Sequence, residues 1–115
     1  MTLLIVDDNP QVRRMIRSLL EDLLTEVYEC ADGAQAVETY AQHRPDWVLM
    51  DIEMGAVNGL TATRTLKALD PEARILMVTN YHDDALRTAA AQAGACGYVR
   101  KENLLELRRW LQPAA

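Results

Sequence analysis

The chain has 115 residues and a formal net charge of −5, with half of its residues apolar and a quarter charged. This size and composition fit one globular domain, 1–115, and the acidic balance argues against a primary nucleic-acid surface, which needs a basic stripe. The longest uninterrupted apolar run has four residues, whereas a membrane-spanning helix needs about 20.

The beginning of the chain and its cysteines indicate a cellular compartment. The first residues turn acidic at Asp7 and Asp8 without a basic segment before them, unlike a secretory signal. Two cysteines, Cys30 and Cys96, are too few for a disulfide-stapled protein and are expected to be small core residues. We therefore expect a cytoplasmic protein with no membrane association.

Short aliphatic runs alternate with helical periodicities along the whole chain. The first run is followed by Pro10, which can open a helix with Asn9 or Asp8 as its cap. The apolar positions of this helix then follow helical spacing and include Met15. The expected strands are 3–6, 26–30, 47–50, 75–78 and 96–100. The helices that follow them are expected over about 10–23, 34–43, 60–66, 83–94 and 104–111.

The repetition of strand and helix predicts the fold class. The strands start roughly 20–25 residues apart, and each is followed by a helix. Such a chain forms a five-stranded parallel sheet of the (βα)5 kind, and right-handed crossovers place helices on both faces. We therefore predict a doubly wound α/β fold.

The residues that end the strands carry the chemistry, because open parallel sheets place their sites beyond the carboxyl ends of the strands. The side chains at these positions are three carboxylates, one hydroxyl and one ammonium, from Asp7, Asp8, Asp51, Thr79 and Lys101. Each one alone has an ordinary structural explanation. Their occurrence at the ends of four of the five expected strands predicts one cluster.

This cluster needs a positive charge. Two carboxylates about 4 Å apart repel by on the order of 4 kcal/mol at an effective dielectric near 20. Mg²⁺, which prefers oxygen ligands, would offset that repulsion, and Lys101 and Thr79 could hold an anionic oxygen. Acids, metal, ammonium and hydroxyl together suit phosphoryl transfer, with one aspartate as the nucleophile.

At this point the sequence resembles the receiver domain of bacterial two-component response regulators, over essentially its whole length. The resemblance rests on Leu-Ile-Val-Asp7-Asp8-Asn-Pro, Val-Leu-Met-Asp51-Ile-Glu-Met with Asn58-Gly59, Met-Val-Thr79-Asn, and Gly94-Ala-Cys-Gly-Tyr98-Val-Arg-Lys101. It implies the flavodoxin-like strand order 2-1-3-4-5. It also implies a signalling switch, not an enzyme beyond self-phosphorylation and autodephosphorylation.

The resemblance assigns roles to individual residues. Asp51 is implied as the phosphoacceptor, Lys101 as the partner of the phosphoryl group, and Thr79 and Tyr98 as the switch pair. Mg²⁺ is the implied cofactor, with direct ligands Asp8, Asp51 and the backbone carbonyl of Glu53, and with Asp7 acting through water. Phosphorylation would remodel the face formed by the fourth helix, fifth strand and fifth helix.

The resemblance also implies partners. A sensor histidine kinase or a phosphotransfer domain would supply the phosphoryl group, and a homodimer on phosphorylation is possible. Thr79-Asn80-Tyr81 and Glu102 are most similar to receivers that precede a helix-turn-helix DNA-binding domain. The output would then be transcription, without direct nucleic-acid contact by this domain. A stand-alone receiver and a fragment of a longer regulator both remain open.

Three departures from the family pattern are visible. Gly55 replaces a usual proline and predicts a looser loop beside the acceptor. Glu102 replaces the proline that usually follows the lysine, so we predict a trans Lys101–Glu102 bond. Glu53 and Tyr81 occupy positions that tune hydrolysis, and Tyr81 predicts a long-lived phosphorylated form.

Two other functions share some of these features. A haloacid-dehalogenase-type phosphatase uses similar groups, but it places the nucleophile on its first strand and the acid pair last. A pseudo-receiver that only binds proteins would not need the intact cluster. Outside the cluster, Arg13, Arg14 and Arg17 are equally compatible with kinase docking and with a solvated face, and Arg108 and Arg109 are expected to be solvated. Trp110 is expected to pack within the chain, with an exposed position in an interface as the alternative.

Overall fold

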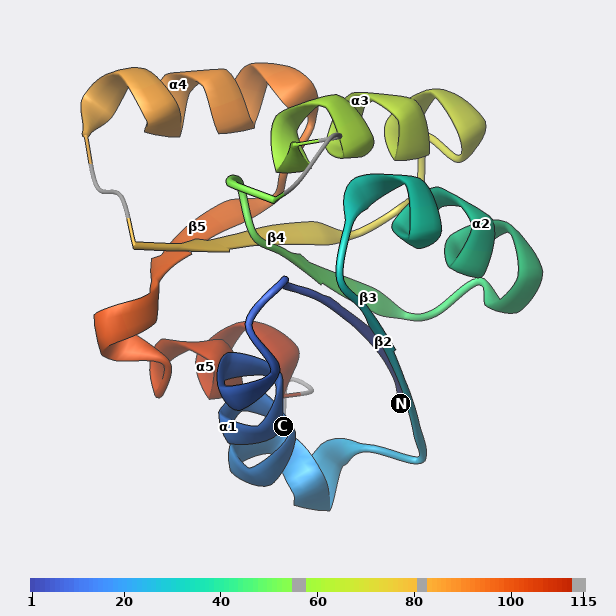
Figure 1. The fold of residues 1–115 in the computed structure, drawn as a ribbon, viewed down its shortest axis with the longest axis vertical. Helices are drawn as coiled ribbons and strands as arrows, with labels where there is room; N and C mark the ends of the chain where they lie inside the picture. The colour runs from blue at the N-terminus through green and yellow to red at the C-terminus, as the bar shows by residue number, and fades with distance from the viewer. Residues whose placement is uncertain (55–57, 81–82, 113–115) are drawn as a thin grey trace.

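A single parallel sheet organises the molecule (Figure 1). The computed structural model describes residues 1–54, 58–80 and 83–112. Five strands lie in the order β2-β1-β3-β4-β5, which confirms the predicted fold class and strand order. Their bounds are β1 (Thr2–Val6), β2 (Glu26–Cys30), β3 (Trp47–Met50), β4 (Ile75–Thr79) and β5 (Gly97–Arg100).

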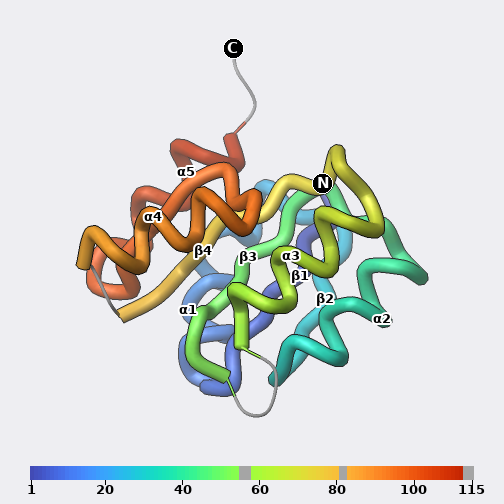
Figure 2. Tube along the Cα trace, turned by 90° about the horizontal axis from the view of Figure 1, so that it is seen from above, coloured from blue at the N-terminus to red at the C-terminus, as the bar shows by residue number. Residues whose placement is uncertain are grey.

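Helices cover both faces of the sheet. Figure 1 shows α2, α3 and α4 on one face and α1 and α5 on the other, and Figure 2 shows α2, α3 and α4 side by side above the strands. The α-helices are α1 (Pro10–Leu20), α2 (Gly33–His43), α3 (Gly59–Leu69), α4 (Asp84–Ala93) and α5 (Glu106–Leu111), with 3-10 turns η1 (Glu21–Leu23) and η2 (Lys101–Asn103). None of the described helices is long and apolar enough to cross a membrane.

The hydrophobic core is divided by the sheet into two layers. Alternate strand residues point to opposite faces, so Leu4 packs toward α2, α3 and α4 whereas Leu3 packs toward α1 and α5. The central strands are buried on both faces, which is why they appear in the sequence as continuous apolar runs.

The helices begin at side chains that accept a hydrogen bond from the backbone of the first turn. Asn9 caps α1 by accepting from the Gln11 amide at 2.9 Å, directly before Pro10. Asp32, Asn58 and Asp83 cap α2, α3 and α4 in the same way. Such caps satisfy amide groups that have no partner within the helix, and they set where each helix begins.

On the α1 and α5 side, Met15 departs from the apolar face that the helical spacing indicates, and the expectation of a solvated Arg108 was wrong. Met15 is 55% exposed, because the buried face of α1 is a narrow stripe around Ile16 and Leu20. Arg108 is not simply solvated, because it makes a bidentate pair with Asp22 at 2.7 and 2.9 Å.

Of two further side chains near β5, one differs from the sequence expectation. Cys96 is exposed, because it precedes an edge strand of the sheet and lies outside both core layers. Trp110 lies over Gly97, as expected for packing within the chain, yet it remains 40% exposed. The final helix, expected from residue 104, begins at Glu106 after the η2 turn, and Leu104 is nevertheless buried.

Candidate functional site

The carboxyl edge of the sheet collects the five strand-end residues that the sequence singled out. Asp7 and Asp8 directly follow β1, and Asp51 directly follows β3. Thr79 is the last residue of β4, and Lys101 comes immediately after β5. The parallel ladder brings these ends to one edge, because the backbone amide of Asp51 donates to the carbonyl of Val6 at 2.9 Å.

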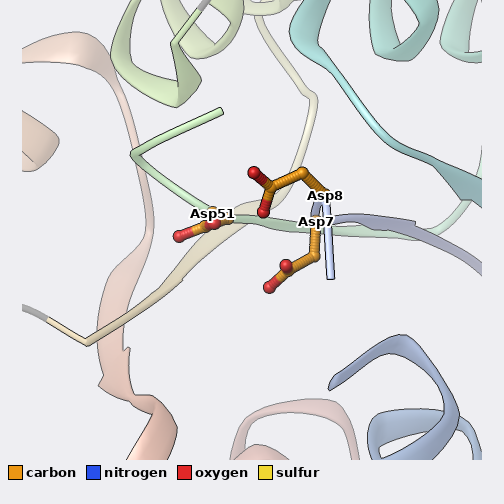
Figure 3. A group of neighbouring side chains, drawn as sticks. All are labelled: Asp7, Asp8 and Asp51. Atoms are coloured by element: carbon orange, nitrogen blue, oxygen red, sulfur yellow. The ribbon is translucent and has the colours of Figure 1, made fainter. Parts of the chain in front are cut away.

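Three carboxylates form the centre of this site. One oxygen from each of Asp7, Asp8 and Asp51 can be chosen so that all three lie within 4.8 Å of one another. Figure 3 shows Asp7 and Asp8 leaving the end of β1 on opposite sides, with Asp51 at the same edge. Asp7 and Asp51 are buried, whereas Asp8 is exposed. The cluster therefore has two buried acids and one that faces solvent.

Lys101 supplies the positive charge next to the buried acids. Its Nζ lies 2.7 Å from Asp7 Oδ2 and 3.3 Å from Asp51 Oδ2. Burial alone would lower the pKa of Lys101, but its hydrogen bond to Asp7 and the charge on Asp51 outweigh burial and raise that pKa. Lys101 is thus held as an ammonium at the edge of the sheet.

One ammonium does not compensate for the burial of Asp51 among acids. Burial, followed by the negative charge of Asp7 and a smaller contribution from Asp8, raises the pKa of Asp51 to about 6, although Lys101 acts in the opposite direction. A set of clustered carboxylate oxygens with unbalanced negative charge is the donor set that Mg²⁺ prefers. The residues present therefore fit a hard divalent cation.

The backbone beside Asp51 is packed tightly against the start of α3. The amide of Gly59 donates to the carbonyl of Ile52 at 2.7 Å. A Cβ atom at Gly59 would lie 1.9 Å from the backbone oxygen of Asp51, a distance that no side chain can occupy. The sequence had presented Gly59 only as part of a motif. Its position after a helix cap was the available signal, but the close approach needed the structure.

A hollow of about 230 Å³ opens beside the acids. It is lined by Asp8, Asn9, Asp51, Glu53, Thr79, Asn80 and Lys101. Asn9 and Asn80 were not predicted as site residues. The hollow has room for a small anionic group between the carboxylates, the ammonium and the Thr79 hydroxyl.

Tyr98 occupies a different place from the other predicted residues. It is half-buried in β5 and lines a neighbouring hollow of about 290 Å³ with Arg87, Arg100 and Glu106. The guanidinium of Arg87 lies 5.6 Å from the centre of the Tyr98 ring. Burial, with a further contribution from the charge of Asp83, raises the pKa of Tyr98.

The departures from the family pattern have different outcomes. The Lys101–Glu102 peptide bond is trans, as predicted. Glu53 is exposed and lines the site hollow. Gly55 and Tyr81 lie outside the described residues, so the predictions of a looser loop and of a long-lived phosphorylated form stay predictions.

A family model for the response regulator receiver domain matches residues 3–111. The chain belongs to this family. The receiver domain is 41% identical over 100 residues to the chemotaxis protein CheY of Bacillus subtilis, covering 86% of this chain and 83% of that protein. It is 37% identical over 105 residues to the response regulator GacA of Pseudomonas aeruginosa, covering 90% of this chain and 49% of GacA.

A solved structure of a response regulator also resembles this chain. A two-component response regulator of the LuxR family from Aurantimonas sp. SI85-9A1 superposes with a TM-score of 0.87 at 36% identity, covering 94% of this chain and 79% of that one. The chain is therefore a two-component signal-transduction receiver, and this family is not a catalytic enzyme family in itself. The alternative of a haloacid-dehalogenase-type phosphatase was wrong.

Membership has two general consequences. Receiver domains bind Mg²⁺ at an acidic pocket, and they are phosphorylated by histidine kinases or phosphotransfer proteins. The chain spans about half the length of GacA, so these consequences concern the receiver domain and not the remainder of such a longer regulator.

Proposed function

We propose that Asp51 accepts the phosphoryl group from the phosphohistidine of a sensor histidine kinase or a phosphotransfer domain. The observation that carries this proposal is the place of its carboxylate, buried beside Asp7 and 3.3 Å from the Lys101 ammonium. Asp7 is paired with Lys101, and Asp8 faces solvent. Of the two buried acids, Asp51 is the one that follows β3, the middle strand of the sheet.

We propose Asp8, Asp51 and the backbone carbonyl of Glu53 as the direct Mg²⁺ ligands, with Asp7 acting through water. The contacts of Asp7 support this division. Its Oδ1 accepts from the amide of Asn9 at 2.8 Å and its Oδ2 pairs with Lys101 at 2.7 Å, so both oxygens already have protein partners. Bound Mg²⁺ would offset the charge of the carboxylates and of the incoming phosphoryl oxygens.

The transfer itself needs alignment and charge neutralisation more than acid–base chemistry. A carboxylate oxygen of Asp51 forms a bond to phosphorus as the phosphorus–nitrogen bond of the donor breaks. The electron pair of that bond goes to the imidazole nitrogen, which takes a proton from solvent. Lys101 pairs with one phosphoryl oxygen, and the Thr79 hydroxyl donates to another.

The switch follows from the new charge. Thr79 moves toward the phosphoryl oxygens and Tyr98 moves inward behind it, which changes the face of α4, β5 and α5. Without a partner, the same site supports only self-phosphorylation from small donors and autodephosphorylation. We place the domain in the cytoplasm, with transcription through another domain or partner as its output and a homodimer as its possible phosphorylated state. It makes no direct contact with nucleic acid or membrane.

Intact-mass analysis tests the acceptor. The wild type, incubated with a small acyl phosphate and Mg²⁺, should gain one phosphoryl group, whereas Asp51→Asn should gain none. An adduct on both proteins would move the acceptor to another residue. Repeated hydrolysis of the donor without an adduct would contradict the proposal.

Thermal unfolding tests the metal ligands independently of phosphorylation. A cation that binds only the native state raises the melting temperature, by an amount set by its concentration relative to Kd. Addition of MgCl₂ should raise the melting temperature of the wild type and should raise that of Asp8→Ala much less. Equal increases in both proteins would remove Asp8 from the ligand set.

A further inference from the structure

Arg13 of α1 reaches the backbone of the acid pair. Its Nη1 donates to the carbonyl oxygen of Asp7 over 2.6 Å, and its side chain is only 19% exposed. We propose that Arg13 is a positioning residue for the Mg²⁺ site, which rests on the function proposed above. It acts by fixing the backbone between the end of β1 and the start of α1, and not by contact with the metal or the phosphoryl group.

The segment after β1 is held at successive points. The amide of Asp7 donates to the carbonyl of Cys30 at 3.0 Å, which extends the ladder with β2 by one residue. The carboxylate of Asp7 accepts from the amide of Asn9 and pairs with Lys101. The Asp7 carbonyl lies beyond the last rung of the ladder, and it is this group that Arg13 binds.

Asp8 lies between two fixed neighbours, Asp7 and Asn9. Its own side chain is exposed, so its direction depends on the backbone that carries it. A metal ligand that is displaced by about 1 Å loses much of its affinity, because ligands act only at defined distances and angles. The contact between Arg13 and Asp7 thus determines where the solvent-facing carboxylate points.

The guanidinium of Arg13 is itself fixed from β2. Its Nε donates to Glu29 Oε1 at 2.9 Å, and Arg17 Nη1 donates to Glu29 Oε2 at 2.8 Å. Glu29 lies two residues after Val27, which packs on the α1 side, and therefore points to the same face. Both oxygens of Glu29 are used, one for each arginine, so the planar guanidinium of Arg13 is oriented toward Asp7.

The sign of the effect separates positioning from electrostatics. Arg13 carries a positive charge close to a cation site, so by Coulomb interaction alone its removal would strengthen Mg²⁺ binding. If Arg13 positions the acid pair, its removal weakens Mg²⁺ binding. Arg17 provides a matched control, because it is on the same helix, has the same charge and binds the same glutamate. Its ion pair with Glu29 does not involve the backbone of Asp7.

The experiment compares the wild type with Arg13→Gln, Arg13→Lys and Arg17→Gln. Mg²⁺ affinity is measured at 25 °C by NMR titration of ¹⁵N-labelled protein with MgCl₂ at constant ionic strength. Thermal unfolding in EDTA measures stability separately. The initial rate of adduct formation with a small acyl phosphate, followed by intact mass at several Mg²⁺ concentrations, separates the half-saturating Mg²⁺ concentration from the maximal rate.

We expect Arg13→Gln to raise the Kd for Mg²⁺ about tenfold, the range typical of groups that orient metal ligands. Arg13→Lys, whose ammonium can bind the carbonyl but not Glu29 as well, should recover part of this loss. Arg17→Gln should stay within about twofold of the wild type, since it leaves the contact with Asp7 in place.

Other results would overturn the inference. An unchanged or lower Kd in Arg13→Gln would do so even if the melting temperature in EDTA falls, because Arg13 would then be only a brace between α1 and β2. Equal losses in Arg13→Gln and Arg17→Gln would assign the effect to Glu29. Failure of the wild type to bind Mg²⁺ would contradict the proposed function as well, whereas a binding wild type with an unaffected Arg13→Gln contradicts this inference alone.

Discussion

Asp51 is unfavourable for the stability of the metal-free protein. Its pKa is raised from 3.8 to about 6, first by burial and then by the charge of Asp7, so the folded state holds its proton more tightly than the unfolded chain does. In that pH interval the native protein binds more protons, and its stability falls as the pH rises from 4 toward 6. Above pH 6 the full penalty is present, at about 3 kcal/mol for a shift of this size.

Replacement of this acid by its neutral isostere tests that penalty. In EDTA at pH 7, Asp51→Asn should be more stable than the wild type by up to about 3 kcal/mol, because the amide carries no charge. The difference should shrink as the pH is lowered through 6 and should vanish near pH 4, where Asp51 is protonated. Urea unfolding at a series of pH values measures it. A difference independent of pH would assign it to packing instead of charge.

Gly59 and Gly97 predict a contrast between two glycine substitutions. Gly59→Ala would place a methyl group against the backbone oxygen of Asp51, which cannot move without displacing the acceptor. We expect a loss of about 1–3 kcal/mol in the free energy of unfolding and a reduced rate of phosphorylation. Urea unfolding and intact mass measure both effects.

Gly97→Ala is the control for this contrast. Its methyl group would meet the ring of Trp110, a partly exposed side chain that can shift. Tryptophan fluorescence should change while phosphorylation at Asp51 stays close to that of the wild type. If both substitutions slow phosphorylation equally, the close packing of Gly59 against Asp51 is not the cause of the slower rate.

The composition of the candidate site was predictable, but its internal contacts were not. Asp7, Asp8 and Asp51 could be placed at one edge because each follows an aliphatic strand. The sequence did not show that Asp7 is bound on its carboxylate by Lys101 and on its backbone by Arg13. Those contacts join segments far apart in the chain, and no local pattern encodes them.

At the scale of elements, α4 is a short helix defined by its two ends. Asp83 caps its first turn by accepting from the amide of Leu86 at 2.7 Å, and Gly94 ends it with a φ of 104°, a left-handed conformation that favours glycine. The range 83–94 expected from the sequence agrees with both ends to within one residue, since the signals that end a helix are local. Between them α4 buries only Ala90 and Ala93, so the stability of α4 depends more on its capped ends than on buried side chains.

Loss of the Asp83 cap should therefore loosen α4 selectively. Asp83→Ala should cost about 1 kcal/mol, since the amide of Leu86 then loses its partner. Asp84→Ala is the matched control, because Asp84 lies in the first turn and contributes only through the helix dipole, about 0.3–1 kcal/mol. Native-state hydrogen exchange should show faster exchange at the start of α4 in Asp83→Ala. Equal exchange in the two variants would argue against the cap.

The elements that were predicted less well depend on tertiary contacts. Helical spacing marked Met15 as apolar but did not show that only a narrow stripe of α1 touches the sheet. Arg108 looked like a solvent-facing residue of the last helix, yet it binds Asp22 and the carbonyl of Leu19. The width of a buried face and the pairing of distant charges follow from how helices dock, which periodicity does not describe.

At the scale of the whole molecule, the sheet separates two apolar layers, which we expect to unfold as one cooperative unit. Leu66 lies in the layer under α2, α3 and α4, and Leu107 lies in the layer under α1 and α5. Both are fully buried. Leu66→Ala and Leu107→Ala should each reduce the free energy of unfolding by about 2–5 kcal/mol.

The double variant tests how the layers are coupled. Because the two leucines are on opposite faces and share no cavity, their effects should add to within about 0.5 kcal/mol. Urea unfolding followed by circular dichroism and by tryptophan fluorescence should give coincident transitions. A strongly non-additive result, or two separate transitions, would show that the faces unfold differently from this description.

The ion pair between Lys101 and Asp7 joins the end of β5, the last strand along the chain, to the end of β1, the first strand along the chain. A ribosome releases Asp7 and Asp8 first, then Asp51, and Lys101 only afterwards. A nascent chain that has emerged only as far as β4 therefore carries the carboxylates without the ammonium that pairs with them. The complete site exists only after β5 has joined the sheet, so a nascent chain that has not yet released β5 is unable to receive the signal.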